Sequence, residues 1–163
     1  MNLVLNKYTL VLLILTSTFL TKAQVSNFPQ GENQRASVSQ NMGLVKIEVI
    51  YNSPDVTSPD GKDRGNQIWG QLIKDGMTKE RWMENKGDTT TLKPYRMGAN
   101  ENTIIKVSHD ILVEGKKLPA GTYSLFGIPN KDEWTIIFSN KTDSWGHYFY
   151  DKDIDALRVE VKT

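Results

Sequence analysis

The chain has 163 residues and no cysteine, and its 20 basic and 19 acidic residues give a formal net charge of +1. Such a near-neutral balance provides no basic stripe, so we expect neither nucleic acid nor an anionic membrane surface as a partner. Without disulfides the stability must come from a buried core, and a chain of this length is long enough to build one in a single domain.

The N-terminus is typical of a bacterial export signal. Lys7 precedes a mostly apolar run over residues 8–20, and Thr21, Lys22 and Ala23 end it with small residues at the −1 and −3 positions. The run is shorter than the roughly 20 apolar residues that a membrane-spanning helix needs. We therefore expect a signal peptide over residues 1–23 and a mature protein that does not span the membrane and lies in the periplasm or outside the cell. An uncleaved N-terminal anchor is the alternative.

The mature chain is predicted to begin with a flexible lead-in over residues 24–35, followed by one β-domain over residues 36–163. In residues 44–51, apolar Val45, Ile47 and Val49 alternate with Lys46 and Glu48, as in a strand with one buried face and one solvated face. Further strands are predicted over residues 36–40, 103–107, 111–113, 122–128, 134–139 and 157–161. Residues 52–66 are expected to form a surface loop, residues 77–84 a short helix, and residues 86–93 a hairpin or loose loop.

Residues 114–138 give the surest structural prediction. Pro119, Ala120 and Gly121 form a turn before one strand, and Pro129 with Asn130 separates it from the next. Short strands with frequent turn signals and almost no helix favour an all-β fold, an antiparallel β-sandwich of about seven or eight strands with at most one short helix. A β-barrel is the alternative.

The most polar segment between two predicted strands is residues 96–102. Arg96 is suited to holding a carboxylate or phosphate, and Asn100 and Glu101 to reading hydroxyl or amide groups. We predict these three residues, with Arg64 and Trp145, as a ligand-binding patch. The structural alternative is a turn in which Gly98 takes positive φ, Asn100 makes an Asx turn and Arg96 pairs with Glu101.

No catalytic residue can be named from the sequence. His109 and His147 are the only histidines, and the acidic run that begins at Asp151 lacks the glycine and glutamate of an EF-hand loop, so no metal or cofactor is expected. A pair of carboxylates for hydrolysis needs no fixed spacing, which leaves an enzyme as an open alternative. The aromatic residues Trp69, Trp145, Tyr148 and Tyr150 are interpreted mainly as core residues, with a sugar-stacking platform as the alternative.

The order of several sequence strings resembles one family of exported bacterial domains. These strings are GLVKIEVIYNSP, IWG, YRMGANENTIIKVS, GKKLPAGTYSLFGIP, EWTIIFS, WGHYFYD and LRVEV, and the whole match runs from about residue 36 to residue 161. They resemble the domain of unknown function 2911, with Tyr95 where that family usually has tryptophan. The resemblance implies an exported, β-rich protein without an assigned activity. It also implies some tens of further residues after Val161, in which case the chain is truncated at Thr163.

These observations favour a non-catalytic binding or interaction module of the bacterial envelope. The expected ligand is a glycan, a cell-wall fragment or a protein, held by the patch around Arg96, Asn100 and Glu101. The alternative is an envelope hydrolase that uses carboxylates of the same loop, such as Glu101.

Overall fold

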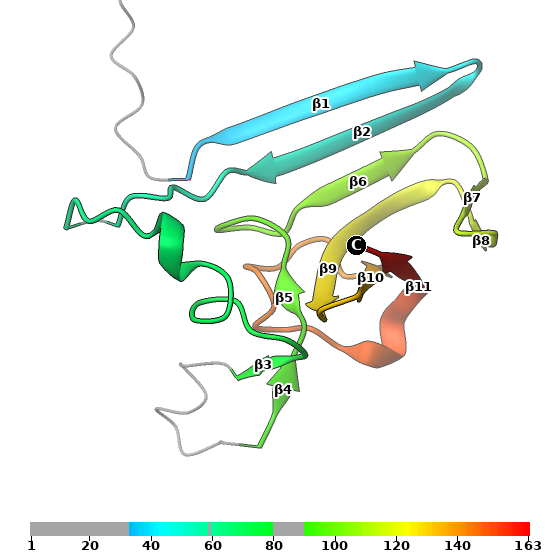
Figure 1. Ribbon diagram of the computed structural model, residues 1–163. Coiled ribbons are helices and arrows are strands. Elements are labelled where there is room, and N and C mark those ends of the chain that lie inside the picture. The colour runs from blue at the N-terminus through cyan, green and yellow to red at the C-terminus, as the bar shows by residue number, and fades with distance from the viewer. Residues whose placement is uncertain (1–32, 59, 80–89) are drawn as a thin grey trace, which may run out of the picture. The chain divides into compact units, whose positions relative to one another are not determined.

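The computed structural model describes residues 33–58, 60–79 and 90–163 (Figure 1), and residues 32–163 belong to one compact unit. The expected signal peptide over residues 1–23 and most of the lead-in over residues 24–35 lie outside the described residues. None of the helices within the described ranges is long and apolar enough to cross a membrane.

The fold is all-β and antiparallel, as the sequence predicts. A seven-stranded sheet has the order β1-β2-β6-β9-β10-β11, and a short strand, β5, pairs with β9 beyond the end of β6. The strands of this sheet are β1 (Arg35–Met42), β2 (Val45–Asn52), β5 (Tyr95–Arg96), β6 (Ile104–Val107), β9 (Gly121–Pro129), β10 (Glu133–Ser139) and β11 (Asp155–Lys162). The sheet is open at β1 and β11, which agrees with a β-sandwich and not with the barrel alternative.

Two small hairpins complete the β-structure. One pairs β3 (Thr78–Lys79) with β4 (Leu92–Lys93), and the other pairs β7 (Ile111–Val113) with β8 (Lys116–Leu118). The 3-10 turns η2 (Gly65–Gln67) and η3 (Lys152–Ile154) lie in the connections. Figure 1 places the two hairpins at opposite ends of the sheet.

The predicted helix over residues 77–84 is wrong in its described part. Thr78 and Lys79 are extended and pair with Lys93 and Leu92. Backbone pairing with a segment beyond residue 90 overrides the weak local helical pattern, since secondary structure in short segments follows tertiary context. The remainder of that prediction, residues 80–84, lies outside the described residues.

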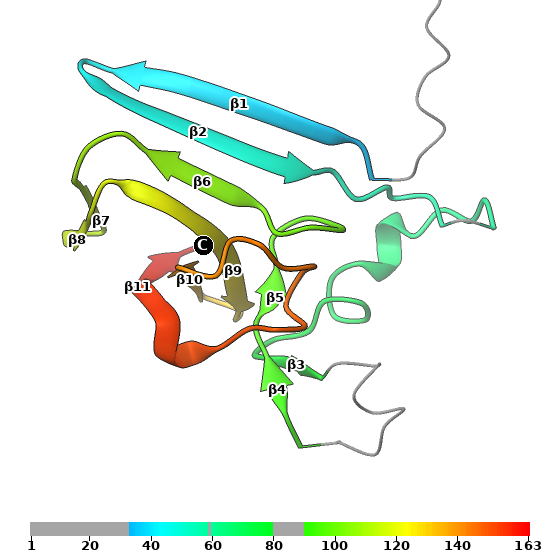
Figure 2. The ribbon, with the colours of Figure 1, turned by 180° about the vertical axis from the view of Figure 1, so that it is seen from behind.

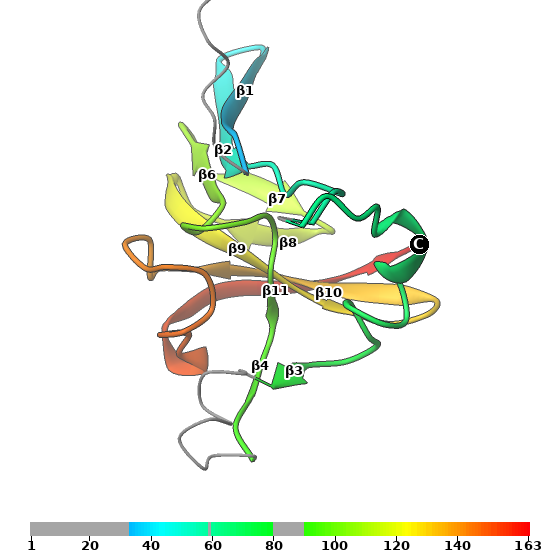
Figure 3. The ribbon, with the colours of Figure 1, turned by 90° about the vertical axis from the view of Figure 1, so that its left-hand side faces the viewer.

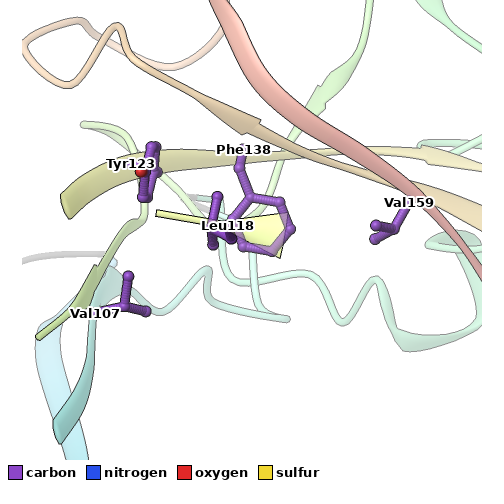
Figure 4. Packing of buried hydrophobic residues seen from close by; sticks show 5 residues of the cluster. All are labelled: Val107, Leu118, Tyr123, Phe138 and Val159. Carbon is purple, nitrogen blue, oxygen red and sulfur yellow. The ribbon is translucent and has the colours of Figure 1, made fainter. Parts of the chain in front are cut away.

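The β7–β8 hairpin covers one face of the sheet and closes the main core. Leu118 of the hairpin is fully buried, and the cluster around it takes one residue from each of four sheet strands: Val107, Tyr123, Phe138 and Val159. Figure 4 shows these five side chains together. The Tyr123 and Phe138 rings meet edge to face, with centroids 6.4 Å apart. The hairpin is therefore the opposing layer at this end of the sandwich.

The opposite face of the sheet is covered by the connection between β10 and β11, over residues 140–154. Tyr150 from this connection packs on Phe126 and Ile137, and the Phe126 and Tyr150 ring centroids lie 5.1 Å apart. Figure 2 shows this segment crossing the sheet beside β5 and β9. The sheet is thus covered on both faces, which explains why residues of either parity in β9 are buried.

Candidate functional site

The predicted site segment, residues 96–102, begins at the end of β5 and continues into the loop that we call the site loop, residues 97–103. This loop lies where β5 and β6 share one neighbouring strand. Arg96 of β5 pairs with Phe126, and Ile104 of β6 pairs with Ser124, so β5 and β6 follow one another along the same edge of β9. The intervening residues must loop out. Gly98 has a φ of 130°, and a Cβ there would lie 2.7 Å from Thr103 Oγ1, so only glycine fits this position. The predicted positive φ at Gly98 is confirmed.

Arg96 lies on the face covered by residues 140–154. Its Nη1 donates a hydrogen bond to the carbonyl of Asn100 at 3.2 Å, and its guanidinium lies against Gly146. The arginine therefore ties the site loop to the connection between β10 and β11. The predicted pairing of Arg96 with Glu101 is wrong.

Glu101 and Asn100 instead contact the N-terminal hairpin. Glu101 Oε2 accepts a hydrogen bond from Asn52 Nδ2 at 3.0 Å and lies 4.0 Å from Arg35 Nη1. Asn100 has a φ of 56°, and its Oδ1 accepts a hydrogen bond from Asn33 Nδ2 at 3.3 Å. The loop is thus held between the start of β1, the end of β2 and the β10–β11 connection.

The other two predicted site residues differ in position. Arg64 donates from Nη2 to the carbonyl of Asp55 at 2.7 Å and from Nε to that of Val56 at 3.3 Å, which closes its own loop. Trp145 is about half exposed and follows Ser144, which contacts the site loop, in the chain. Ser144 and Gly146, the neighbours of Trp145 in the chain, contact Asn102 and Arg96, whereas Arg64 belongs to a separate loop.

Asn102 is a buried anchor for this whole region that the sequence analysis missed. Its Nδ2 lies within hydrogen-bond distance of Ser124 Oγ at 2.9 Å, Ser144 Oγ at 2.8 Å and the Lys141 carbonyl at 3.3 Å. A buried polar group needs such partners, because losing them costs the desolvation of the group. Asn102 therefore fastens residues 141–144 onto β9.

One of the two histidines, His109, lies away from this loop. His109 follows β6 at the end away from residues 97–103, and its Nδ1 contacts Ser108 Oγ at 2.8 Å. Asp110 accepts from the Ala120 N–H at 2.8 Å and pairs with Lys117 at 2.7 Å, so it shapes the turn before β9. Within the described ranges, no three His, Cys, Asp or Glu side chains lie close enough to hold a metal ion.

A groove of about 430 Å³ opens on the face of the sheet opposite the Arg96 guanidinium, beside the main core. Directly paired residues of antiparallel strands share a face, so Tyr51, Leu125 and Trp134 lie on the face that carries the buried Tyr123 and Phe138. The hairpin covers this face near Tyr123, and the groove lies farther along β9. Its lining is mainly apolar and includes Tyr51, Ile73, Tyr95, Leu125, Pro129 and Trp134.

The sequence explains the shape of the groove. Gly127 pairs with both Tyr95 and Ile136, and a Cβ at Gly127 would lie 3.4 Å from the Trp134 ring, so the glycine leaves room for the tryptophan to lie across the strand. The segment before β3 forms one wall. It is anchored by two hydrogen bonds, from the Lys74 N–H to Tyr95 Oη at 3.0 Å and from the Gly76 N–H to the Pro129 carbonyl at 2.6 Å.

An aromatic pair extends the groove wall toward solvent. Trp69 packs edge to face on Trp134, with ring centroids 5.7 Å apart and an interplanar angle of 68°, and its own side chain is 63% exposed. Of the aromatic residues interpreted as core, Tyr150 is buried, whereas Trp69 and Trp145 are exposed. The groove residues were missed because they come from four distant segments. The signal in the sequence that could have indicated the groove was the order Gly127, Ile128 and Pro129, followed by Trp134.

A polar cluster holds Tyr150 in the opposite face. Its hydroxyl donates to Asp155 Oδ2 at 2.7 Å, and the Arg158 guanidinium contacts both groups, with Nε 2.8 Å from the same carboxylate oxygen. Burial, together with the hydrogen bond to Asp155 and the charge of that carboxylate, raises the pKa of the Tyr150 hydroxyl well above its ordinary value. Arg158 opposes this shift only in part. The cluster stabilises the turn into β11.

Comparison with known families supports the resemblance of the sequence strings. Residues 33–163 match the family described as "Protein of unknown function (DUF2911)". The chain belongs to this family. No curated protein matches the chain significantly, and no solved structure does.

Two segments within the strings that resemble DUF2911 have clear structural roles here. The string GANE, residues 98–101, forms the turn of the site loop, with positive φ at Gly98 and Asn100. The string LPAGTYSLF, residues 118–126, supplies core residues on both faces, including Leu118 and Phe126. In this DUF2911 domain the second string builds the sheet, and the first positions the loop beside the groove.

Proposed function

We propose that this DUF2911 domain is a non-catalytic binding module of the bacterial envelope, and that its ligand lies in the groove between Tyr51, Tyr95 and Trp134. The observation that carries the proposal is the groove itself. Its volume of about 430 Å³ falls within the roughly 300–1,000 Å³ typical of ligand pockets, and its mainly apolar lining is also typical of them.

The lining indicates the kind of ligand. Aromatic side chains offer flat apolar surfaces, which suit the C–H face of a sugar ring or an apolar side chain. Two polar side chains of the lining already have partners: Asn52 donates to Glu101, and Thr103 Oγ1 donates to the Met97 carbonyl. We therefore infer that the ligand presents an apolar face to the groove, as a glycan, a cell-wall fragment or a protein segment can.

In this proposal the residues of the predicted ligand-binding patch have roles other than contact with the ligand. The Arg96 guanidinium lies on the opposite face of the sheet from Trp134, and Glu101 is held by Asn52. We propose that Arg96, Asn100 and Glu101 position the loop that carries Met97 and Gly98 into the groove lining. Trp145 and Arg64 lie outside the lining and serve as comparison positions.

The export of the protein is part of the same proposal. It is supported by Lys7, the apolar run over residues 8–20 and the small residues before Gln24. Fractionation of cells that express the full chain should place the protein in the periplasm or the medium, with an N-terminus at Gln24. A chain that lacks residues 2–23 should stay in the cytoplasm. Equal distribution of the two chains would contradict export.

A ligand screen tests the binding role. Glycans, cell-wall fragments and envelope proteins are screened against the purified protein, and hits are titrated against Trp134→Ala and the comparison variant Trp145→Ala. We expect Trp134→Ala to weaken a hit at least about tenfold, which is the loss of roughly 1.4 kcal/mol of contact, and Trp145→Ala to leave it unchanged. Equal affinities in the two variants would contradict the groove as the site.

The same screen separates binding from hydrolysis. Each glycan and cell-wall fragment is also assayed for product. Turnover that disappears in Glu101→Gln, with the melting temperature preserved, would replace the binding role by the hydrolase alternative.

A further inference from the structure

Among the described residues no strand pairs with the outer edge of β1, and β1 lacks the sequence features that usually protect an edge strand. All eight residues of β1 pair in register with β2, from Arg35 opposite Asn52 to Met42 opposite Val45, with no bulge. Natural edge strands are commonly blunted by lysine, proline or a bulge. β1 has none of these, and Arg35 is its one charged residue. Figure 3 shows the β1–β2 hairpin extending away from the β9–β10–β11 part of the sheet.

The opposite edge of the sheet provides a comparison within the same molecule. β11 carries alternating charges on Arg158, Glu160 and Lys162, which hinder the approach of another strand. At β1 the single charge lies at the first residue, 4.0 Å from Glu101 Oε2. The edge from Ala36 to Met42 is uncharged, so a strand of the same sequence would meet no like charge along it.

The hydrogen-bond pattern shows which backbone groups of β1 face outward. The Ser53 N–H donates to the Gln34 carbonyl at 2.8 Å, which makes this pair hydrogen-bonded. In an antiparallel ladder such pairs alternate, so Ala36, Val38 and Gln40 direct their backbone groups toward β2. The backbone N–H and C=O groups of Arg35, Ser37, Ser39 and Asn41 therefore point outward.

We propose that two copies of the chain associate by antiparallel pairing of their β1 strands, about a two-fold axis at Val38. This register sets outward-facing residues opposite one another, Ser37 against Ser39 of the second copy and Arg35 against Asn41. It also brings Val38, whose side chain is 60% exposed, against its own counterpart. The apolar faces of the two sheets, each with Val38 and Val49 on one side, then become continuous.

A charge variant tests the interface in the purified protein. Sedimentation or light scattering of the wild type, from micromolar to near-millimolar concentration, should show a monomer–dimer equilibrium. Val38→Lys sets two lysines opposite one another and should raise the dimer Kd about tenfold or more. Leu112→Lys, at a 72% exposed site on β7, is the matched control and should behave as wild type. A wild type that stays monomeric, or equal Kd values for the two variants, would overturn the proposal.

Cysteine cross-linking tests the register separately. The chain contains no cysteine, so a single introduced thiol can form a disulfide only with a second copy. In the proposed register Val38 makes a non-hydrogen-bonded pair with itself, with Cα atoms about 4.5 Å apart, within the range of disulfides. Val38→Cys should cross-link rapidly under mild oxidation and Leu112→Cys slowly. Equal rates would contradict this pairing, and faster cross-linking of Ser39→Cys than of Val38→Cys would contradict the register.

Discussion

The Arg96 guanidinium lies directly against Gly146, where a Cβ would stand 2.9 Å from Nη1 and 3.0 Å from Cδ. Gly146 also has a φ of 57°, a conformation that strains other residues. This contact and the hydrogen bonds of Asn102 join the site loop to residues 141–146 from the other side of β9. The loop is therefore shaped from the face opposite the groove.

Substitution of Gly146 tests this contact. Gly146→Ala should lower the free energy of unfolding by about 1–3 kcal/mol, because it combines the positive φ with displacement of the arginine. Gly115→Ala is the matched control, since Gly115 has a φ of 75° with open space around a Cβ. Chemical denaturation should find Gly146→Ala the more costly of the two, and less costly in an Arg96→Ala background. A cost no greater than that of Gly115→Ala would contradict the role of the contact.

Asn102 should contribute strongly to stability. Asn102→Ala removes its hydrogen bonds to Ser124 and Ser144 in a buried site, and we expect a loss of about 2–3 kcal/mol in the free energy of unfolding. Asn130→Ala, at an exposed position in the turn between β9 and β10, should change it by less than about 0.5 kcal/mol. Urea denaturation of the two variants measures the difference. Similar losses would show that Asn102 is not an anchor.

The β7–β8 hairpin offers a matched pair of leucines. Leu118 is fully buried in the main core, whereas Leu112 is 72% exposed. Leu118→Ala should cost about 2–5 kcal/mol, because it leaves a cavity beneath the hairpin, and Leu112→Ala less than about 0.5 kcal/mol. If both variants unfold at the wild-type denaturant concentration, the hairpin is not the opposing layer of the core.

Tyr150 should make the protein sensitive to alkaline pH. Its pKa is raised in the folded state above the ordinary value of 10.0. Below pH 10 the Tyr150 hydroxyl keeps its proton in both the folded and the unfolded state, so its full contribution to the free energy of unfolding is present. As the pH rises above 10 the unfolded state loses the proton first, and the free energy of unfolding falls.

Tyr150→Phe removes this titration. Urea denaturation at about pH 8 and about pH 11 should show a smaller alkaline loss of stability in Tyr150→Phe than in the wild type. At neutral pH the variant should be less stable by about 1 kcal/mol, because the hydrogen bond to Asp155 is lost. Tyr123, whose pKa is also raised, keeps part of the alkaline effect in both proteins. An unchanged alkaline loss would contradict the account of Tyr150.

Local sequence signals predicted the strands with strong alternation and clear turns. Residues 122–128 and 134–139 lie in β9 and β10, because proline, glycine and alternating apolar residues determine these segments locally. Thr78 and Lys79 were predicted wrongly as helical because their conformation depends on pairing with β4. The last predicted strand is the sheet edge β11, as its alternating charges indicate.

The sequence predicted only the part of the candidate site that lies within one loop. The polar residues 96–102 lie together because they are neighbours in sequence, but their partners come from β1, β2 and residues 141–146. The sequence alone did not show that Asn52 and Arg35 would be near Glu101. The groove depends on Tyr51, Tyr95 and Trp134, which only the strand order brings onto one face.

The most direct test of the groove is to fill it. A side chain at Gly127 projects toward the ring of Trp134, where a Cβ alone would already lie 3.4 and 3.5 Å from ring atoms, so the two γ-methyl groups of Gly127→Val should displace the ring and occupy the groove. Thr122→Val, at an exposed position of the same strand, is the control. The measurement is the Kd of a ligand from the screen. We expect it to rise at least about tenfold in Gly127→Val and to stay at the wild-type value in Thr122→Val, with both proteins folded. An unchanged Kd in a folded Gly127→Val would contradict the groove as the binding site.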